Sequence, residues 1–253
     1  MSGHSKWATI KRKKAATDSA RGRLFTRLIK EITIAARNGG ANPEGNPRLR
    51  LAVQTAKAAN MPADNIKRAI QKGTGELPGV SYEEVTYEGF GPGGVAILVE
   101  VVTDNSNRAV SEMRHVFSRN HGNFGQTGSV AWMFHRKGTI VVPKAKQNMP
   151  LTEDDLLGII LEAGADDILT EEDAYTVTTS PQSFETVKKA VEDKGITIET
   201  ASLQMFPQNT IKITGKEAEQ TLKLMEALEE HEDVQNVYSN FDIDEKELAA
   251  LHG

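Results

Sequence analysis

Cysteine is absent from the 253-residue chain, which excludes disulfide bonds, thiolate nucleophiles and thiolate zinc sites. Long apolar runs are also missing: those at 95–99 and 156–161 fall far short of the roughly 20 residues that a membrane span requires. No apolar stretch follows the basic N-terminus, so a secretory signal is excluded as well. We therefore expect a folded protein of a reducing compartment, with no membrane segment.

Signatures of catalysis and of metal binding are missing too. The six histidines form neither H-x-H nor H-E-x-x-H, and there is no G-x-S-x-G elbow. The acidic runs at 153–155 and 171–173 lack the ligand spacing of a calcium loop. Gly89, Gly91 and Gly94 match the dinucleotide pattern G-x-G-x-x-G, but an apolar β-branched stretch follows where a helix is required, which favours a turn between strands. We expect no enzyme activity, no catalytic residue, no metal site and no cofactor.

The net charge of −5 conceals a strong asymmetry along the chain. Residues 1–78 have 16 Lys and Arg against 5 Asp and Glu, a net charge of +11, whereas residues 79–253 have 14 against 30, a net charge of −16. A basic surface concentrates polyanions, so this division predicts a phosphate-rich partner for the first third of the chain. The alternative is that two surfaces of opposite sign bind each other within the chain.

The pattern of the basic third predicts a tail followed by three short amphipathic helices. A first helix, from about Ser19, has one apolar face, and four cations line the opposite side with Ile34 as the exception among them. Asn46-Pro47 predicts the start of a second helix, and a third is expected from Pro62 to Gly73.

Basic residues of the tail and of these helices are the predicted contacts to phosphates, together with the tail tryptophan. The predicted nucleic-acid-binding residues are Lys6, Trp7, Lys11, Arg12, Lys13, Lys14, Arg21, Arg23, Arg27, Lys30, Arg37, Arg50, Lys57, Lys67 and Arg68. The first-helix stripe consists of Arg23, Arg27, Lys30 and Arg37, none of which is expected to face the core. Trp7 and Phe25 are the only aromatic residues in the basic third, which is poor for stacking on unpaired bases. A structured partner, duplex DNA or folded RNA such as the ribosome, is therefore expected.

The rest of the chain has the pattern of an α+β protein with an inserted domain. Strands are expected at 85–87 and 95–102, a helix at 106–120, and strands at 129–134 and 139–142. Further on, a helix at 153–163, strands at 167–169 and 175–178, a helix at 183–194 and a strand at 197–203 give the ferredoxin-like order βαββαβ. The final elements, at 210–213, 216–230 and 234–238, are expected to complete the unit begun at 82–134. The predicted domains are 1–78, helical behind a basic tail; 79–134 with 207–253, discontinuous; and 135–206, inserted.

Several long blocks of the sequence resemble the YebC/PmpR family. They are GHSKWATIKRKK at 3–14, MPADNIKRAI at 61–70, YEGFGPGG at 87–94, TDNSNR at 103–108, GNFG at 122–125 and GSVAWMF at 128–134. The second half of the chain is similar mainly in pattern and length. His121 and Phe124 depart from the family pattern, where Gly and Leu are expected.

The resemblance implies a three-domain α+β fold and a cytoplasmic protein. Residues 1–37 have the charge of an organelle transit peptide, but the family block begins at Ser2 or Gly3, so no removable leader is expected. The family is described as transcriptional regulators that bind promoter DNA. Its mitochondrial relative is a translational activator of a cytochrome oxidase subunit, and bacterial members are connected to ribosomes stalled at proline-rich sequences. The resemblance thus implies a DNA-binding transcriptional regulator, with a ribosome-associated translation factor as the alternative.

Overall fold

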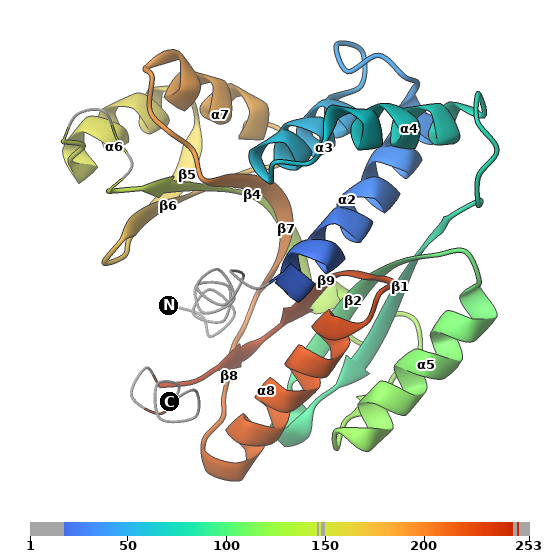
Figure 1. Ribbon diagram of the computed structural model, residues 1–253. Coiled ribbons are helices and arrows are strands. Elements are labelled where there is room, and N and C mark those ends of the chain that lie inside the picture. The colour runs from blue at the N-terminus through green and yellow to red at the C-terminus, as the bar shows by residue number, and fades with distance from the viewer. Residues whose placement is uncertain (1–17, 146, 148–149, 245–246, 248–253) are drawn as a thin grey trace. The chain divides into compact units, whose positions relative to one another are not determined.

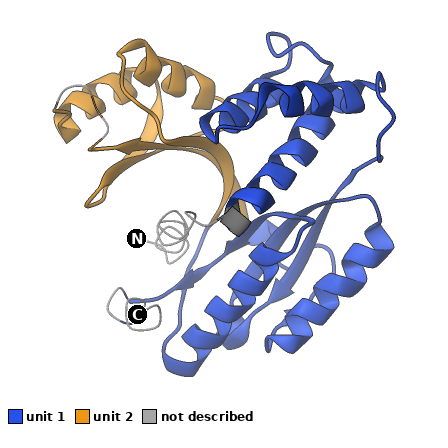
Figure 2. Cartoon of the chain, viewed as in Figure 1, with its two compact units in different colours: residues 1–133, 207–253 blue, residues 134–206 orange. Residues whose placement is uncertain are grey.

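The computed structural model describes residues 18–145, 147, 150–244 and 247. Within these residues no helix is long and apolar enough to cross a membrane. The chain forms two compact units, residues 1–133 with 207–253 and residues 134–206 (Figure 2). Both contain helices packed with antiparallel strands, so the α+β class is confirmed. The segments predicted as a helical and a discontinuous domain lie together in the first unit.

Three helices form the basic part of the first unit: α2 (Asp18–Gly39), α3 (Pro47–Ala58) and α4 (Ala63–Thr74). The Asn46 side chain accepts a hydrogen bond from the Leu49 amide and so caps α3, with Pro47 at the first helical position. α3 and α4 pack along α2 (Figure 1) around Leu28, Ile32, Leu49, Val53 and Ile66. Gly73 allows the close approach of α4, because a Cβ there would overlap the Thr33 carbonyl of α2.

A four-stranded antiparallel sheet forms the other part of this unit. Its strands are β1 (Glu83–Phe90), β2 (Ala96–Thr103), β3 (Asn123–Phe124) and β9 (Val234–Ser239), in the order β3-β1-β2-β9. Helices α5 (Ser106–Arg119) and α8 (Gly215–Glu230) lie side by side against the sheet (Figure 1), and their apolar faces share one core with it. β8 (Ile211–Lys212) and β10 (Phe241–Asp242) form a separate parallel pair. β9 pairs with β2, so the returning chain completes the sheet.

The glycine-rich segment between β1 and β2 is a turn, as the sequence predicted. A short 3-10 segment, η1 (Pro92–Gly94), connects the strands, and Gly93 and Gly94 have φ of +70° and +77°. Only glycine adopts such values readily. These glycines therefore serve chain reversal, and β2, where a dinucleotide fold would have a helix, follows them.

The second unit has the elements β4 (Phe134–Pro143), α6 (Glu153–Glu162), β5 (Ala165–Thr170), β6 (Ala174–Thr179), α7 (Phe184–Asp193) and β7 (Thr200–Pro207). This is the order βαββαβ, and the sheet order β5-β6-β4-β7 places the first and third strands of the motif in the centre. A capping box at Thr152 and Asp155 starts α6.

One expected strand, at 129–134, is wrong. Residues 131–133 form the 3-10 turn η2 (Ala131–Met133), and the strand β4 begins only at Phe134. The physical reason is the buried Glu88, whose carboxylate accepts the amide hydrogens of Gly128, Val130 and Ala131. Amides held by a carboxylate are not available to a strand ladder.

Candidate nucleic-acid interface

Six of the fifteen predicted contact residues lie outside the described residues. These are Lys6, Trp7 and the run Lys11, Arg12, Lys13 and Lys14. The remaining nine belong to α2, α3 and α4, the three helices of the first unit.

Five of these nine are exposed, and α4 shows why. Its inner side buries Ile66 and Ala69, which leaves Lys67 and Arg68 toward solvent. Lys72 is exposed one turn after Arg68 and extends the same basic face, although the prediction left it out. The other exposed cations of the predicted set are Arg21, Arg37 and Lys57, while Arg23 and Arg50 are half-buried.

Lys30 does not face solvent, so the prediction for this residue is wrong. Its side chain is buried, and the ammonium group lies 2.6 Å from Asp233, 3.0 Å from the Glu232 carbonyl and 3.1 Å from the Val102 carbonyl. An ammonium group has three N–H donors, and these three partners use them all. Lys30 is therefore a buried ion-pair partner that connects α2 to the end of β2 and to the segment between α8 and β9.

Ile34 also turns out to be inside the fold, and Arg27 is half-buried. The Arg27 guanidinium donates to the Glu229 carbonyl, and burial lowers its pKa. Ile34 is fully buried, so its expected place as an exposed apolar residue within the stripe is wrong. Residues 32–36 are all buried, which means that α2 is covered on both sides in its middle. Of the predicted stripe, Arg37 is exposed, Arg23 and Arg27 are half-buried, and Lys30 is buried.

Asp233 is the centre of a buried network that the sequence did not reveal. Besides Lys30, it accepts from Thr103 at 2.9 Å and from Arg108 at 2.8 Å. Burial alone would raise the pKa of Asp233, but the hydrogen bonds from Lys30, Arg108 and Thr103 outweigh it and lower the pKa. The carboxylate is therefore ionised at neutral pH, and it connects α2, β2 and α5 to the segment between α8 and β9. These partners precede Asp233 by 125 to 203 residues in the chain, so no local pattern could have brought them to it.

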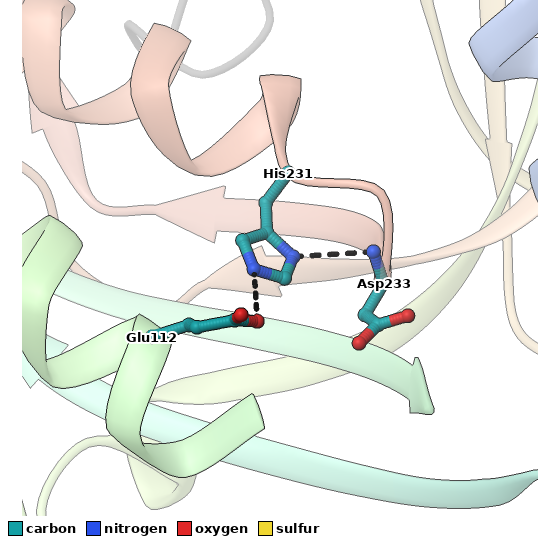
Figure 3. A group of neighbouring side chains, drawn as sticks. All are labelled: Glu112, His231 and Asp233. Atoms are coloured by element: carbon teal, nitrogen blue, oxygen red, sulfur yellow. Dashed lines mark hydrogen bonds and ion pairs between the residues drawn. The ribbon is translucent and has the colours of Figure 1, made fainter. Parts of the chain in front are cut away.

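Glu112, His231 and Asp233 come close enough together to suggest a metal site (Figure 3). Their donor atoms are already used, however. His231 accepts the Asp233 amide hydrogen at Nδ1, so its Nε2 carries the proton and donates to Glu112 at 3.0 Å. The Asp233 carboxylate faces two cations, which would repel a metal ion. This cluster fits a structural hydrogen-bond network and does not fit a metal centre.

Arg48, on α3, is exposed but is also engaged in ion pairs. It bridges Glu31 of α2 at 2.7 Å and Glu84 of β1 at 2.5 Å, and the hydrogen bonds to these two carboxylates raise its pKa. The carboxylates of Glu31 and Glu84 neutralise the charge of Arg48, so this arginine adds little to the positive electrostatic potential of the surface. Within the helical segment, residues 18–78, the exposed cations outside this bridge are thus on α4 and at the ends of α2 and α3.

Comparison with known proteins assigns both parts of the chain to one family. The domain described as "TACO1/YebC protein N-terminal domain" matches residues 5–76, and "TACO1/YebC second and third domain" matches residues 82–241.

Individual relatives are similar over their whole length. A protein of Solibacter usitatus is 60% identical over 251 residues, covering 99% of each chain, and one of Koribacter versatilis is 58% identical over 253 residues, covering 100% of each. Both bear the name "Probable transcriptional regulatory protein". The crystal structure of a conserved hypothetical protein, Aq1575 from Aquifex aeolicus, superposes with a TM-score of 0.84 at 48% identity, covering 92% of this chain and 94% of that one.

Proposed function

Because the chain belongs to the TACO1/YebC family, we propose that it is a non-enzymatic, cytoplasmic regulator that binds duplex DNA in the control of transcription. The exposed basic surface of the helical segment carries this proposal. Residues 18–78 contain 11 Lys and Arg against 5 Asp and Glu, and the exposed cations Lys67, Arg68 and Lys72 share the outer face of one rigid helix. The names of the relatives support the assignment to transcription.

Phosphate neutralisation is the physical basis of the proposed binding. Lys and Arg side chains release counterions when they contact the DNA backbone, whatever the base sequence. Cations fixed on a folded helix lose less entropy on contact than cations on a flexible segment, so they contribute more affinity each. Lys30 is buried against Asp233, so it does not take part in the proposed contact with phosphates.

A salt series of duplex binding tests the proposal. The full chain and the triple variant Lys67→Gln, Arg68→Gln, Lys72→Gln are titrated with a labelled DNA duplex, and the logarithm of the association constant is plotted against the logarithm of salt concentration. If each cation contacts one phosphate, the triple variant loses about 3 units of slope.

A matched variant controls for overall charge. Lys189, Lys194 and Lys216 are exposed lysines outside the helical segment, and their triple change to Gln removes the same charge. We expect this control to keep the wild-type slope. Equal slopes for all three proteins would overturn the role of the α4 face, and a wild-type chain that binds no duplex would overturn the proposed function.

A further inference from the structure

A pocket at the start of α2 has the chemistry of an anion-binding site. Its volume is about 320 Å³, at the small end of the range of roughly 300–1,000 Å³ that is usual for ligand pockets. One wall comes from α2, and the other comes from the segment between α8 and β9. Both walls belong to the first unit of the chain. The lining residues are Gly22, Arg23, Thr26, Arg27, His231 and Glu232.

Two arginines of this lining are neighbours on the surface of α2. Arg23 and Arg27 are four residues apart, a spacing that brings side chains together one turn along a helix. Like charges at this spacing repel each other, and an anion between them removes the repulsion. The Arg23 side chain has no hydrogen-bond or ion-pair partner among residues 18–145 and 150–244. The pocket therefore holds two adjacent cations, one of which the protein does not pair.

Arg27 is only partly satisfied by the protein. Its guanidinium donates to the Glu229 carbonyl, but its Nε–H is shielded from solvent and has no acceptor within the part of the chain that the structure describes. Burial lowers the pKa of Arg27, the charge of Glu229 raises it and the charge of Arg23 lowers it, with a net decrease. The positive charge is therefore incompletely compensated, which is costly for a cation withdrawn from water.

The other polar groups of the lining do not pair with these arginines. His231 uses Nδ1 for the Asp233 amide and Nε2 for Glu112, so its ring is a wall of the pocket and not a donor to it. Glu232 is exposed and forms no ion pair with Arg23 or Arg27 in the described residues. Its carboxylate is the one acidic side chain of the lining, and it weakens the attraction of the pocket for an anion.

We propose that Arg23 and Arg27 hold one phosphate group of a ligand in this pocket. The planar guanidinium donates two parallel N–H bonds to a pair of phosphate oxygens, so arginine is well suited to this group. A phosphate between the two arginines also supplies an acceptor for the Arg27 Nε–H. The Thr26 hydroxyl donates to the Gly22 carbonyl at 3.2 Å and keeps its capacity to accept a bond from the ligand.

The phosphate can belong to a nucleic acid or to a small phosphorylated molecule, because both present the same group. The residues of the basic α4 face, Lys67, Arg68 and Lys72, are not part of the lining. The site therefore goes beyond the proposed duplex binding by α4 and does not depend on it.

Titration calorimetry with inorganic phosphate at constant ionic strength tests the site in the full chain. We expect saturable binding by the wild type. Arg23→Gln and Arg27→Gln should each raise the dissociation constant by at least about 10-fold, the typical effect of one lost hydrogen bond to a charged group. Glu232→Gln should lower the dissociation constant, because the carboxylate that repels the phosphate is removed. Arg21→Gln is the matched control, since Arg21 is exposed on the same helix and does not line the pocket.

Arg23→Gln is the decisive variant, because no protein contact of the Arg23 side chain is lost with it, whereas Arg27→Gln also loses the bond to Glu229. Thermal denaturation without phosphate shows that each variant is folded. The proposal would be overturned by a wild-type chain without saturable phosphate binding, or by equal dissociation constants for Arg23→Gln and wild type. A weakening that Arg21→Gln shares would reflect overall charge and would overturn it as well.

Two further measurements identify the source of the phosphate. Tighter binding of a nucleoside 5′-monophosphate than of inorganic phosphate, with unchanged duplex affinity in Arg23→Gln, indicates a small phosphorylated ligand. Weaker duplex binding by Arg23→Gln, together with competition between phosphate and duplex, indicates the nucleic-acid backbone. Both results support the site. The salt series of the α4 variant tests the proposed function separately, so either proposal can fail while the other stands.

Discussion

At the scale of single residues, the largest effect is expected at Lys30. Its ammonium group compensates the buried Asp233 carboxylate. Changing Lys30→Met keeps the apolar stem but leaves that charge with only Arg108 and Thr103 as side-chain partners. Breaking a buried pair in this way costs about 3 kcal/mol, the lower end of the usual range, because two partners remain. Urea denaturation should show this loss, whereas Lys67→Met on the exposed face of α4 should change stability by less than about 0.5 kcal/mol.

Glu88 gives a residue-scale prediction about pH. Burial would raise the pKa of Glu88, but the amide hydrogen bonds from Gly128, Val130 and Ala131 outweigh it, so the pKa is lowered. A folded-state pKa below the unfolded value of about 4.3 stabilises the protein above that pH, and this contribution is lost as the pH falls through the folded-state value.

The variant Glu88→Gln should therefore be less stable than wild type at pH 7, by about 1–3 kcal/mol, because an amide nitrogen replaces one acceptor oxygen. The difference should shrink as the pH falls below the unfolded-state pKa of about 4.3, because the stabilisation by the ionised carboxylate is lost from there down through the lowered folded-state pKa of Glu88. Denaturation curves from pH 7 to pH 3 measure this, with the exposed Glu44→Gln as control. A difference that stays constant over this range would show that the loop is not held by the ionised carboxylate.

At the scale of helices, a pair of glycines allows packing to be separated from helix propensity. Gly→Ala inside a helix normally stabilises by about 0.5–1 kcal/mol. A Cβ at Gly158 of α6 meets nothing within 4 Å, so Gly158→Ala should show this gain. At Gly73 of α4 the Cβ would overlap the Thr33 carbonyl, and the side chain of Ala36 lies close as well.

Gly73→Ala should therefore destabilise the protein by about 1–3 kcal/mol, the cost of overpacking, despite its better helix propensity. Thermal denaturation of both variants gives the comparison. A stabilised Gly73→Ala variant would mean that α4 can move away from α2 at no cost.

The helices also show what a sequence pattern can and cannot predict. Local signals such as Asn46-Pro47 placed α3 correctly, because capping depends on neighbours in the chain. The apolar face of α2 was also found, with Leu28 and Ile32 in the core. The buried state of Lys30 and Ile34 was missed because periodicity assumes one buried face, and α2 has two. Lysine on a polar face is normally solvated, so only the distant Asp233 explains the exception.

At the scale of the whole molecule, the separation of the chain into a basic and an acidic part could be predicted from the sequence. The structure shows that the acidic part contains a stretch of different character. The acidic part is not uniform: the stretch from 113 to 152 has no acidic residue, and its loop at 128–131 is held by the buried Glu88 carboxylate. The sequence predicted a strand at 129–134, so it did not indicate this loop. Glu88 is 40 residues away from Gly128, and no local rule indicates that it takes the amides of the loop.

The arrangement of exposed cations also predicts how selective duplex binding will be. On α4 they are lysines and arginines. The Asn and Gln residues of this helix, Asn65 and Gln71, are half-buried and do not form an exposed set of the kind that reads base edges in the major groove. Backbone contacts carry affinity but no base information, so selectivity should come mainly from duplex shape.

In competition at one fixed salt concentration, a promoter fragment should be preferred over random duplex by well below about 10³-fold, the lower limit typical of specific binders. Folded RNA of equal length should compete to a similar extent, because it offers the same phosphates. A preference above 10³-fold would require a base-reading element outside α2, α3 and α4, and deletion of residues 1–17 would then show whether the basic tail supplies it.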